Sequence, residues 1–352
     1  MDRAGPTAVE ALIAALPETA GSALYGMVDV LAATGTLWRE LVGEAPTASL
    51  IQPKIVALSR EPFRCGHGIP VIPDVGVDED PEADIVVLPE LWLAPDDDMK
   101  GRYPELLDWI SSPSWCRQHD LFGLLGCGPL GRDGSSERAR GDVPLGLSGP
   151  LPHPLPDVQF RPEPNLVFAD RTGRIVTAGG TTSWHDLAIH IIARHCSPGE
   201  ALRIAKVYLL KWHGEGQLPY ASLVRRQPHA DAVVRHAEDW LAQHFREPHA
   251  VAAVVAVSGI PERSLKRRFK AATGSTLIGY VQNLRIEEAK RMLETGHGSF
   301  EDAAAEVGYE NPAFFRRLFK RCTGLTPGEY RRMFRPFATA TDLPAPVNPA
   351  AA

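Results

Sequence analysis

A pattern that occurs twice, about fifty residues apart, constrains this chain more than any other feature. Each copy has a turn and then a run of helical length, 261–270 in the first copy and 312–321 in the second. Both runs continue into a Thr-Gly pair, at Thr273-Gly274 and Thr323-Gly324. Residues at i, i+3 and i+4 share one side of an α-helix, so each run predicts an amphipathic helix with an apolar inner face and a basic outer face.

The residues before each run complete the pattern. In the first copy Gly259 permits a tight turn, because glycine takes positive φ without a Cβ clash. A helix, a tight turn and a second helix with a basic outer face form a helix-turn-helix, whose second helix lies in the DNA major groove. The alternative is an amphipathic helix whose charged side is only solvated, and the repetition argues against it. Between the copies, 280–294 predicts a helix long enough to space two such units.

Candidate DNA contacts follow from the two basic faces. The first run offers Arg263, Ser264, Lys266 and Arg267, and the second offers Asn311, Arg316, Arg317 and Lys320, with Glu310 just before it. Arginine can bond guanine O6 and N7 together, and asparagine can do the same for adenine, while other cations hold phosphates. Arg268 is left open between a DNA contact and an inward salt bridge.

The second copy also carries a specific set of motifs. They are Ala304-x-x-x-Gly308-Tyr309, Phe315-x-x-x-Phe319-Lys320, Gly324-x-Thr326-Pro327 and Tyr330-Arg331. With them the stretch 231–334 resembles the AraC/XylS family of transcription regulators. The resemblance implies an all-α domain of seven helices with two helix-turn-helix units that enter successive major grooves. Pro261 and Ala313 stand where the family commonly has serine, and both positions bear on base preference.

The charge distribution agrees with a nucleic-acid partner. The whole chain carries a formal net charge of −6, but residues 228–336 hold 17 Lys+Arg against 13 Asp+Glu, a charge of +4. Five cysteines without paired spacing indicate a reducing cytoplasm. No apolar signal run opens the chain and no run of 18 apolar residues occurs, so the sequence predicts a cytoplasmic protein with no membrane partner.

The first 211 residues alternate strand and helix patterns, which predicts an α/β unit with a parallel sheet covered by helices on both faces. The clearest strand is 83–89, an apolar run bounded by Asp84 and Pro89. Further strands are expected at 54–59, 69–72, 165–169 and 174–178, with helices at 23–33, 103–110, 183–195 and 198–210. The stretch 7–16 suits a strand or a helix equally well.

The segments 177–180 and 186–190, together with the C-terminal motifs, resemble the DJ-1/PfpI-like (class I glutamine-amidotransferase-like, flavodoxin-like) domain of the GlxA-like AraC subgroup. The resemblance implies a sensor and dimerisation domain over 1–211, a linker over 212–230 and a DNA-binding domain over 231–336. Residues 337–352, rich in Ala and Pro, are expected to be a disordered tail.

The segment 111–155 breaks this pattern, since it is crowded with Gly, Pro, Ser and Arg and has little periodicity. In the resembling family this region holds a cysteine nucleophile elbow. Residues 122–130 can be encoded by codons that, when read one nucleotide out of frame, encode the elbow sequence S-V-C-S-G. We therefore hypothesise a compensated pair of frameshifts, entered near 111–114 and left near 155–156, which gene sequencing or peptide mapping of 117–161 tests.

Few residues indicate catalysis or metal binding. Cys127 follows no recognisable strand, so it is not assigned as a nucleophile. Glu18 is interpreted as a solvated loop carboxylate rather than an acidic site group. The spacing of His185, His190 and His195 drifts around one helix, which predicts packing or surface histidines rather than a metal site. No cofactor motif is present.

These observations predict a DNA-binding transcriptional regulator that is not an enzyme. The family resemblance implies a homodimer through the N-terminal domain, a small-metabolite effector and, for an activator, contact with RNA polymerase. The alternative is an amidase-like or glyoxalase-like enzyme of the DJ-1 fold with an appended nucleic-acid-binding module, which selective thiol labelling at Cys127 would favour.

Overall fold

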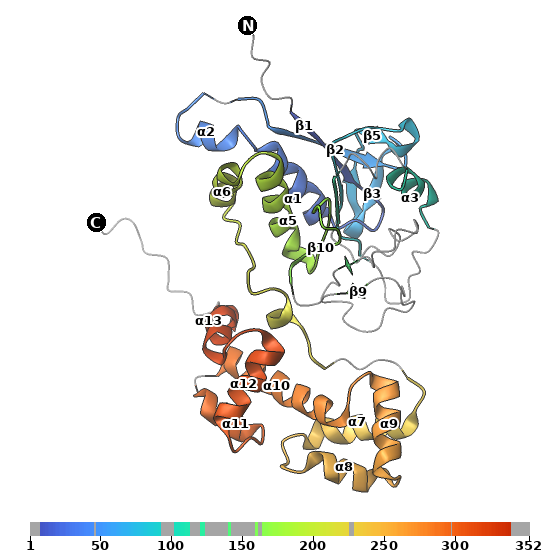
Figure 1. The fold of residues 1–352 in the computed structure, drawn as a ribbon, viewed down its shortest axis with the longest axis vertical. Helices are drawn as coiled ribbons and strands as arrows, with labels where there is room; N and C mark the ends of the chain where they lie inside the picture. Colours follow the sequence, from blue (N-terminus) through green and yellow to red (C-terminus); the bar gives the residue numbers. More distant parts are fainter. Residues whose placement is uncertain are drawn as a thin grey trace, which may run out of the picture. The chain divides into compact units, whose positions relative to one another are not determined.

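Two compact units make up the chain, Met1–Gln217 and Leu218–Ala352 (Figure 1). The computed structural model describes residues 8–45, 47–92, 102–112, 120–123, 140–141, 159–160, 164–224, 229–296 and 298–338. Among these residues, no helix combines the length and the apolar character that a membrane crossing requires.

In the described part of the N-terminal unit, a seven-stranded sheet has the order β10-β11-β7-β6-β1-β2-β5. The strands are β1 (Val9–Ala14), β2 (Ile51–Ala57), β5 (Val75–Gly76), β6 (Ile85–Leu88), β7 (Asp120–Gly123), β10 (Leu166–Phe168) and β11 (Ile175–Ala178). Every neighbouring pair is parallel except β10 and β11, which are antiparallel. The predicted parallel sheet is confirmed, and the expected strand at 69–72 instead belongs to a separate antiparallel pair, β3 (Phe63–Cys65) with β4 (Ile69–Val71).

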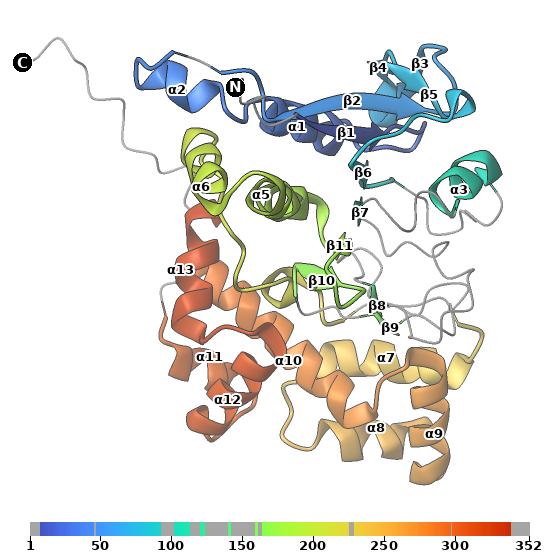
Figure 2. The same ribbon diagram turned by 45° about the horizontal axis from the view of Figure 1, so that its top comes forward.

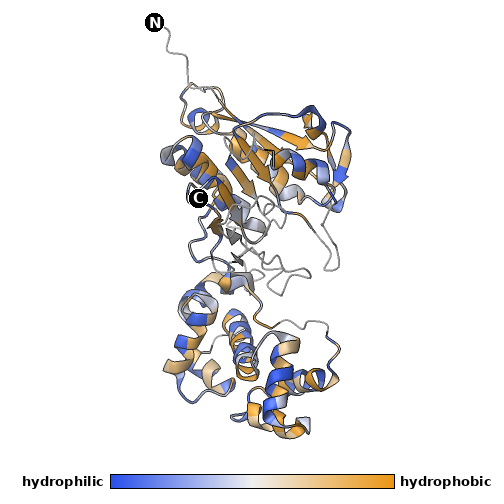
Figure 3. Cartoon of the chain, turned by 45° about the vertical axis from the view of Figure 1, so that its right-hand side comes forward, coloured by the Kyte–Doolittle hydropathy of each residue, from blue (hydrophilic) through white to orange (hydrophobic). Residues whose placement is uncertain are grey.

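Helices cover both faces of this sheet, as predicted. On one face lie α1 (Gly21–Ala32), α5 (Trp184–His195) and α6 (Pro198–Val207), and on the other lies α3 (Pro104–Ile110). In β1, Ala11 and Ile13 join the core under α1 and α5, whereas Leu12 and Ala14 join the core under α3. This period of two identifies 9–14 as a strand buried on both sides, so the helical alternative for this stretch is excluded. Figure 3 shows the apolar colouring along the strands and the inner sides of the helices.

The remaining elements of this unit are short. They are α2 (Leu37–Leu41), the parallel pair β8 (Arg140–Gly141) with β9 (Gln159–Phe160), and the 3₁₀ turns η1 (Gly66–Gly68), η2 (Val77–Glu79) and η4 (Thr181–Ser183). The segment predicted to be atypical, 111–155, contains β7, which pairs with β6 and β11. Phe122 at its centre is fully buried. A strand therefore does precede Cys127, contrary to the prediction, because β7 ends at Gly123. Cys127 itself and most of 111–155 lie outside the described residues.

The C-terminal unit is all α-helical, as predicted. Its seven described helices are α7 (Ala232–His244), α8 (Ala250–Ser258), α9 (Glu262–Thr273), α10 (Leu277–Thr295), α11 (Phe300–Glu306), α12 (Pro312–Thr323) and α13 (Pro327–Ala338). Two apolar cores form, one from α7 to the start of α10 and one from the rest of α10 to α13. The 19-residue helix α10 lies between α9 and α12 in the views of Figures 1 and 2. At about 1.5 Å per residue it spans about 28 Å.

The boundary between the units falls inside the range expected to be a linker. On its N-terminal side, Gln217 is 2% exposed, accepts a hydrogen bond from the Gly180 amide and donates one to the Pro164 carbonyl. On its C-terminal side, a turn η5 (Leu218–Tyr220) and the residues up to Val224 pack on the helices of the second unit. At the end of the chain, α13 continues to Ala338, so residues 337 and 338 of the expected tail are helical, and 339–352 lie outside the described residues.

Candidate nucleic-acid interface

The first helix-turn-helix consists of α8 and α9. Gly259 ends α8 in the left-handed conformation, with φ of 68°, which glycine adopts without strain. Leu265 and Phe269 of α9 are fully buried in the first core, one helical turn apart. The opposite side of α9 is exposed and carries the basic residues that the sequence predicted.

The second helix-turn-helix consists of α11 and α12 and repeats this arrangement. Gly308 follows α11 with φ of 87°, and Phe315 and Phe319 of α12 are fully buried in the second core. Asn311 is the N-cap of α12, where its side-chain oxygen accepts a hydrogen bond from the Phe314 amide at 2.9 Å. Pro312 at the first helical position suits a helix start.

The Thr-Gly pairs form the same C-terminal cap in both copies. The Thr273 hydroxyl donates to the Phe269 carbonyl at 2.8 Å, and the Thr323 hydroxyl donates to the Phe319 carbonyl at 2.9 Å. The glycines that follow have φ of 73° and 76°. The stacking repeats as well, because Phe269–Tyr280 and Phe319–Tyr330 are edge-to-face pairs with centroids 5.2 and 5.4 Å apart. The Thr-Gly caps and the ring pairs of the two copies therefore correspond at an offset of fifty residues.

On α9, the four predicted contact residues differ in exposure and in whether they form an ion pair. Arg263 and Arg267 are exposed, and neither forms an ion pair with any residue that the structure describes. Lys266 is exposed but lies 2.5 Å from the Glu262 carboxylate one turn earlier. Ser264 is half-buried. The arginines are thus the groups on this helix that are best placed to meet a ligand.

On α12, Arg317 and Lys320 are exposed and have no ion-pair partner within the described part of the chain. Arg316 is exposed too, but its guanidinium pairs with Glu301 of α11 and lies 5.6 Å from the centroid of the Phe300 ring. Glu310 is exposed before the helix. Asn311 uses its amide oxygen for the N-cap, so the two-bond contact with adenine that the sequence suggested would require that cap to open.

Arg268, which the sequence left open, forms an inward salt bridge. Its guanidinium donates two hydrogen bonds to the Asp231 carboxylate, at 2.8 and 2.7 Å. Asp231 is also the N-cap of α7, accepting from the Val233 and Val234 amides. The bond from Arg268 holds the pKa of Asp231 well below its usual value, at about 2. Arg268 thus fastens α9 to the start of α7.

Comparison with known proteins gives a match for this region. A family model described as a helix-turn-helix domain matches residues 254–333. The arabinose operon regulatory protein of Salmonella typhimurium is 32% identical over 106 residues, which are 30% of this chain and 37% of that protein. The C-terminal unit contains a helix-turn-helix domain of the AraC type.

Two solved structures extend the comparison. The DNA-binding domain of AdpA, in complex with a target DNA, is 28% identical, with a TM-score of 0.29, and covers 30% of this chain and 95% of that one. DJ-1beta of Drosophila melanogaster is 15% identical, with a TM-score of 0.42, and covers 58% of this chain and all of that one. This chain spans less than half the length of the arabinose regulator that it resembles.

Arg285, which no sequence pattern singled out, joins the two halves of the AraC-type domain. From α10 its guanidinium donates to the Phe245 and Glu247 carbonyls, both at 2.7 Å, in the first half. It also donates to the Gly308 carbonyl of the second half at 3.2 Å, and Arg285 as a whole is 7% exposed. A basic residue between inward positions that are mostly apolar is the one signal that the sequence offered, and Lys290 on the same helix is buried in the same way.

The same junction explains why Gly308 has to be glycine. A Cβ there would lie 2.1 Å from the Arg246 carbonyl oxygen, in addition to the unfavourable φ. Arg246 in turn pairs with Glu288 of α10 at 2.5 Å. The turn of the second helix-turn-helix thus packs directly against Arg246, in the segment between α7 and α8 that leads into the first helix-turn-helix.

Residues 218–224 also belong to the AraC-type unit. The Lys290 ammonium, on a residue that is 6% exposed, donates to the Ala221 carbonyl at 2.7 Å and to the Glu287 carboxylate at 3.0 Å. The Leu223 backbone amide donates to the same Glu287 oxygen, and the Asn283 side-chain amide donates to the Leu223 carbonyl. This segment therefore lies along α10.

In the N-terminal unit, Glu18 follows β1 and is not the solvated carboxylate that the sequence analysis expected. Its side chain is 17% exposed and accepts hydrogen bonds from Arg102 at 2.8 Å and from the Tyr103 hydroxyl at 2.6 Å. Burial, and then the bond to Glu18, raise the pKa of Tyr103. The neighbouring residue Thr19 bridges to Leu91 after β6, so Glu18 lies at the carboxyl edge, where β1 and β6 are adjacent.

The three histidines of α5 pack inside this unit, as predicted. His190 and His195 lie edge-on to Phe122 of β7, and His185 lies 4.0 Å from the centroid of its neighbour Trp184. Burial lowers the pKa of His190 and of His195. No group of three or more His, Cys, Asp or Glu side chains within the described ranges is arranged to hold a metal ion.

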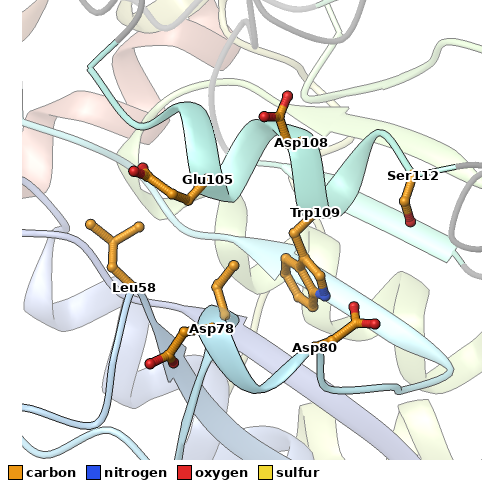
Figure 4. A pocket seen from close by; sticks show the side chains of 8 residues that line it. Leu58, Asp78, Asp80, Glu105, Asp108, Trp109 and Ser112 are labelled. Carbon is orange, nitrogen blue, oxygen red and sulfur yellow. The ribbon is translucent and has the colours of Figure 1, made fainter.

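A second feature of this unit is a shallow pocket with an acidic rim, shown in Figure 4. It lies between the end of β2, η2 and α3 and is lined by Leu58, Val77, Asp78, Asp80, Glu105, Asp108, Trp109 and Ser112. Two of the four carboxylates lie on α3 and the other two lie in η2 or directly after it, and Figure 4 shows that of Asp80 beside the indole of Trp109. Their charge argues against an anionic ligand at this place.

Proposed function

We propose that this protein is a sequence-specific DNA-binding transcriptional regulator, whose helices α9 and α12 enter successive major grooves of an operator. The observation that carries the proposal is a row of exposed cations, repeated on two helices and without an ion-pair partner among the described residues: Arg263 and Arg267 on α9, and Arg317 and Lys320 on α12. Two recognition helices one duplex turn apart have centres about 34 Å apart, which the length of α10 suits.

Capture of genomic fragments by the full-length protein, followed by binding measurements at several salt concentrations, tests this proposal. Each phosphate contact adds nearly one unit to the slope of log K against log salt, so binding is expected to weaken steeply as salt rises. Arg267→Ala and Arg317→Ala should each weaken binding, whereas Arg291→Ala, on the exposed side of α10 and paired with Glu288, should not. Salt-independent binding, or equal loss in all three variants, contradicts the proposal.

We further propose that the N-terminal unit dimerises and binds a small metabolite at the carboxyl edge of its sheet, near Glu18. In open parallel sheets ligands bind at that edge where the connections from two neighbouring strands lead to opposite faces of the sheet. Here β1 leads to α1 on one face, and its parallel neighbour β6 leads to α3 on the other. Glu18, held by Arg102 and Tyr103, supplies a carboxylate for a donor group on the metabolite. Glu18→Gln is expected to weaken the response of DNA binding to the effector without changing DNA binding in its absence.

The remaining elements of the proposal follow from this role. The protein acts in the cytoplasm without a cofactor or catalytic residue, and an activator of this kind also contacts RNA polymerase. An enzymatic role would require a reactive thiol after β7, so fast and selective labelling of Cys127 by a thiol probe is the result that would favour the alternative of a DJ-1-fold enzyme.

A further inference from the structure

The two recognition helices of the repeat differ at the position nearest the bases. The shared Thr-Gly caps and buried pairs fix the offset at fifty residues, so Arg263 of α9 corresponds to Ala313 of α12. Both residues are exposed. The copies are alike in fold but not in the chemistry that their tips present.

Each helix carries one outward row at i, i+4 and i+7. In α9 the row is Arg263, Arg267 and Lys270, and in α12 it is Ala313, Arg317 and Lys320. At about 100° per residue, these three positions lie within about 60° of one another and opposite the buried side. The N-terminal residues of a recognition helix meet the base edges, so positions 263 and 313 are the base-facing ends of the two rows.

The residues next to Arg263 and Ala313 do not compensate for the difference between these two side chains. Next to Arg263, the Lys266 ammonium is held by Glu262, and in α12 the corresponding Arg316 is held by Glu301. Next to Ala313 stands Phe314, which is 44% exposed, with its ring 6.0 Å from that of Tyr309. The tip of α9 therefore presents a guanidinium, whereas the tip of α12 presents a methyl group and a phenyl ring.

We infer that the two halves of the operator are read by different chemistry: Arg263 bonds O6 and N7 of a guanine, and Ala313 lies against the C5 methyl group of a thymine. This inference rests on the proposed function. Guanine is the base whose major-groove edge offers two acceptors to one guanidinium, and alanine is a residue that contacts the thymine methyl. The operator is thus predicted to be asymmetric, with guanine in one half and thymine at the equivalent place in the other.

The expected effects differ in size. Loss of a two-bond arginine contact lowers affinity for the correct base by roughly 5- to 150-fold. Loss of one buried methyl contact lowers affinity by about fourfold. The half-site bound by α9 should therefore contribute most of the discrimination between operator sequences, and the half-site bound by α12 should contribute less.

The test selects binding sites from a random duplex library with the full-length protein and its variants. Wild type should enrich a site with guanine in one half and thymine in the other. Arg263→Ala should remove the guanine preference, and Ala313→Arg should replace thymine by guanine in the second half. Replacing that thymine by uracil should weaken wild type about fourfold and leave Ala313→Arg unaffected. Lys270→Ala, at the far end of the α9 row, should weaken binding to all sequences alike.

Three results overturn the inference. They are guanine at both equivalent places for wild type, an unchanged site for Ala313→Arg, and no effect of uracil at any thymine of the second half. In each case sequence-specific binding persists and the proposed function stands. Failure to enrich any sequence, with no salt-dependent binding, overturns both the inference and the proposed function.

Discussion

Replacement of Arg285 by methionine tests how the two helix-turn-helix units are held together. Methionine keeps much of the length of the side chain but removes all three hydrogen bonds to the Phe245, Glu247 and Gly308 carbonyls. Two of these bonds are 2.7 Å long, and a hydrogen bond to a charged group contributes about 1.5–3 kcal/mol, so the change should cost about 3–5 kcal/mol. That is a large part of the roughly 5–15 kcal/mol that stabilises a typical domain.

Hydrogen exchange of the full-length protein measures this loss separately in each unit, because two units need not unfold together. Amides of α7 to α13 should exchange faster in Arg285→Met, and those of the sheet should not. The matched control is Arg291→Met on the same helix, whose side chain is 61% exposed and paired with Glu288, and which should cost less than about 1 kcal/mol.

The same variant should alter the response to operator spacing. Wild type gains affinity when both half-sites are engaged together, and this gain depends on a fixed separation of the two recognition helices. Arg285→Met should bind the native operator more weakly and lose less affinity when base pairs are inserted between the half-sites. If Arg285→Met matches Arg291→Met in protection and in spacing dependence, the assignment of Arg285 as the link between the halves is refuted.

Three further predictions concern stability. Gly308→Ala and Gly259→Ala both incur the roughly 1–2 kcal/mol of left-handed backbone, but only at Gly308 would the Cβ meet a carbonyl oxygen, so thermal unfolding should show a larger loss there by at least about 1 kcal/mol. Asp231, whose pKa is lowered to about 2, stabilises the fold above its unfolded pKa, and this contribution is lost as pH falls from about 4 through 2; an acid titration of Asp231→Asn should lack that loss. Burial lowers the pKa of His190, so the unfolded state binds the proton more tightly than the folded state. The stability of the N-terminal unit should therefore decrease as pH falls through about 6.5. His190→Leu should reduce this pH dependence of stability, and an unchanged profile would contradict the cause assigned.

Much of the C-terminal unit could be predicted from the sequence, because its elements are local. The helices follow from apolar spacing at 3.6 residues, their ends from Gly259, Gly308 and the Thr-Gly pairs, and their duplication from the fifty-residue offset. The partners of the basic residues could not be predicted, because they come from other elements. Arg316 pairs with α11 and Arg268 with the start of α7, which no pattern along one helix reveals.

The N-terminal unit shows a different limit. Strands such as 83–89 are apolar runs, and the sequence predicts them well. The strand β7 is only four residues long, begins with Asp120 and contains one glycine, so its sequence has no clear period. It is a strand because β6 and β11 pair with it on both sides, which is a long-range effect. Glu18 was misjudged for the same reason, since Arg102 and Tyr103 are distant in sequence.

The position of residues 218–224 decides where the chain can be divided in the laboratory. A fragment that starts at 231, the boundary that the family resemblance implies, would lack the Ala221 carbonyl that accepts a hydrogen bond from Lys290 of α10. It would also expose Phe334, against which Tyr220 lies. Such a fragment should aggregate more readily than one that starts at Leu218. Poor solubility of a fragment that starts at 231 would then result from the choice of its first residue, and would not mean that the domain cannot fold alone.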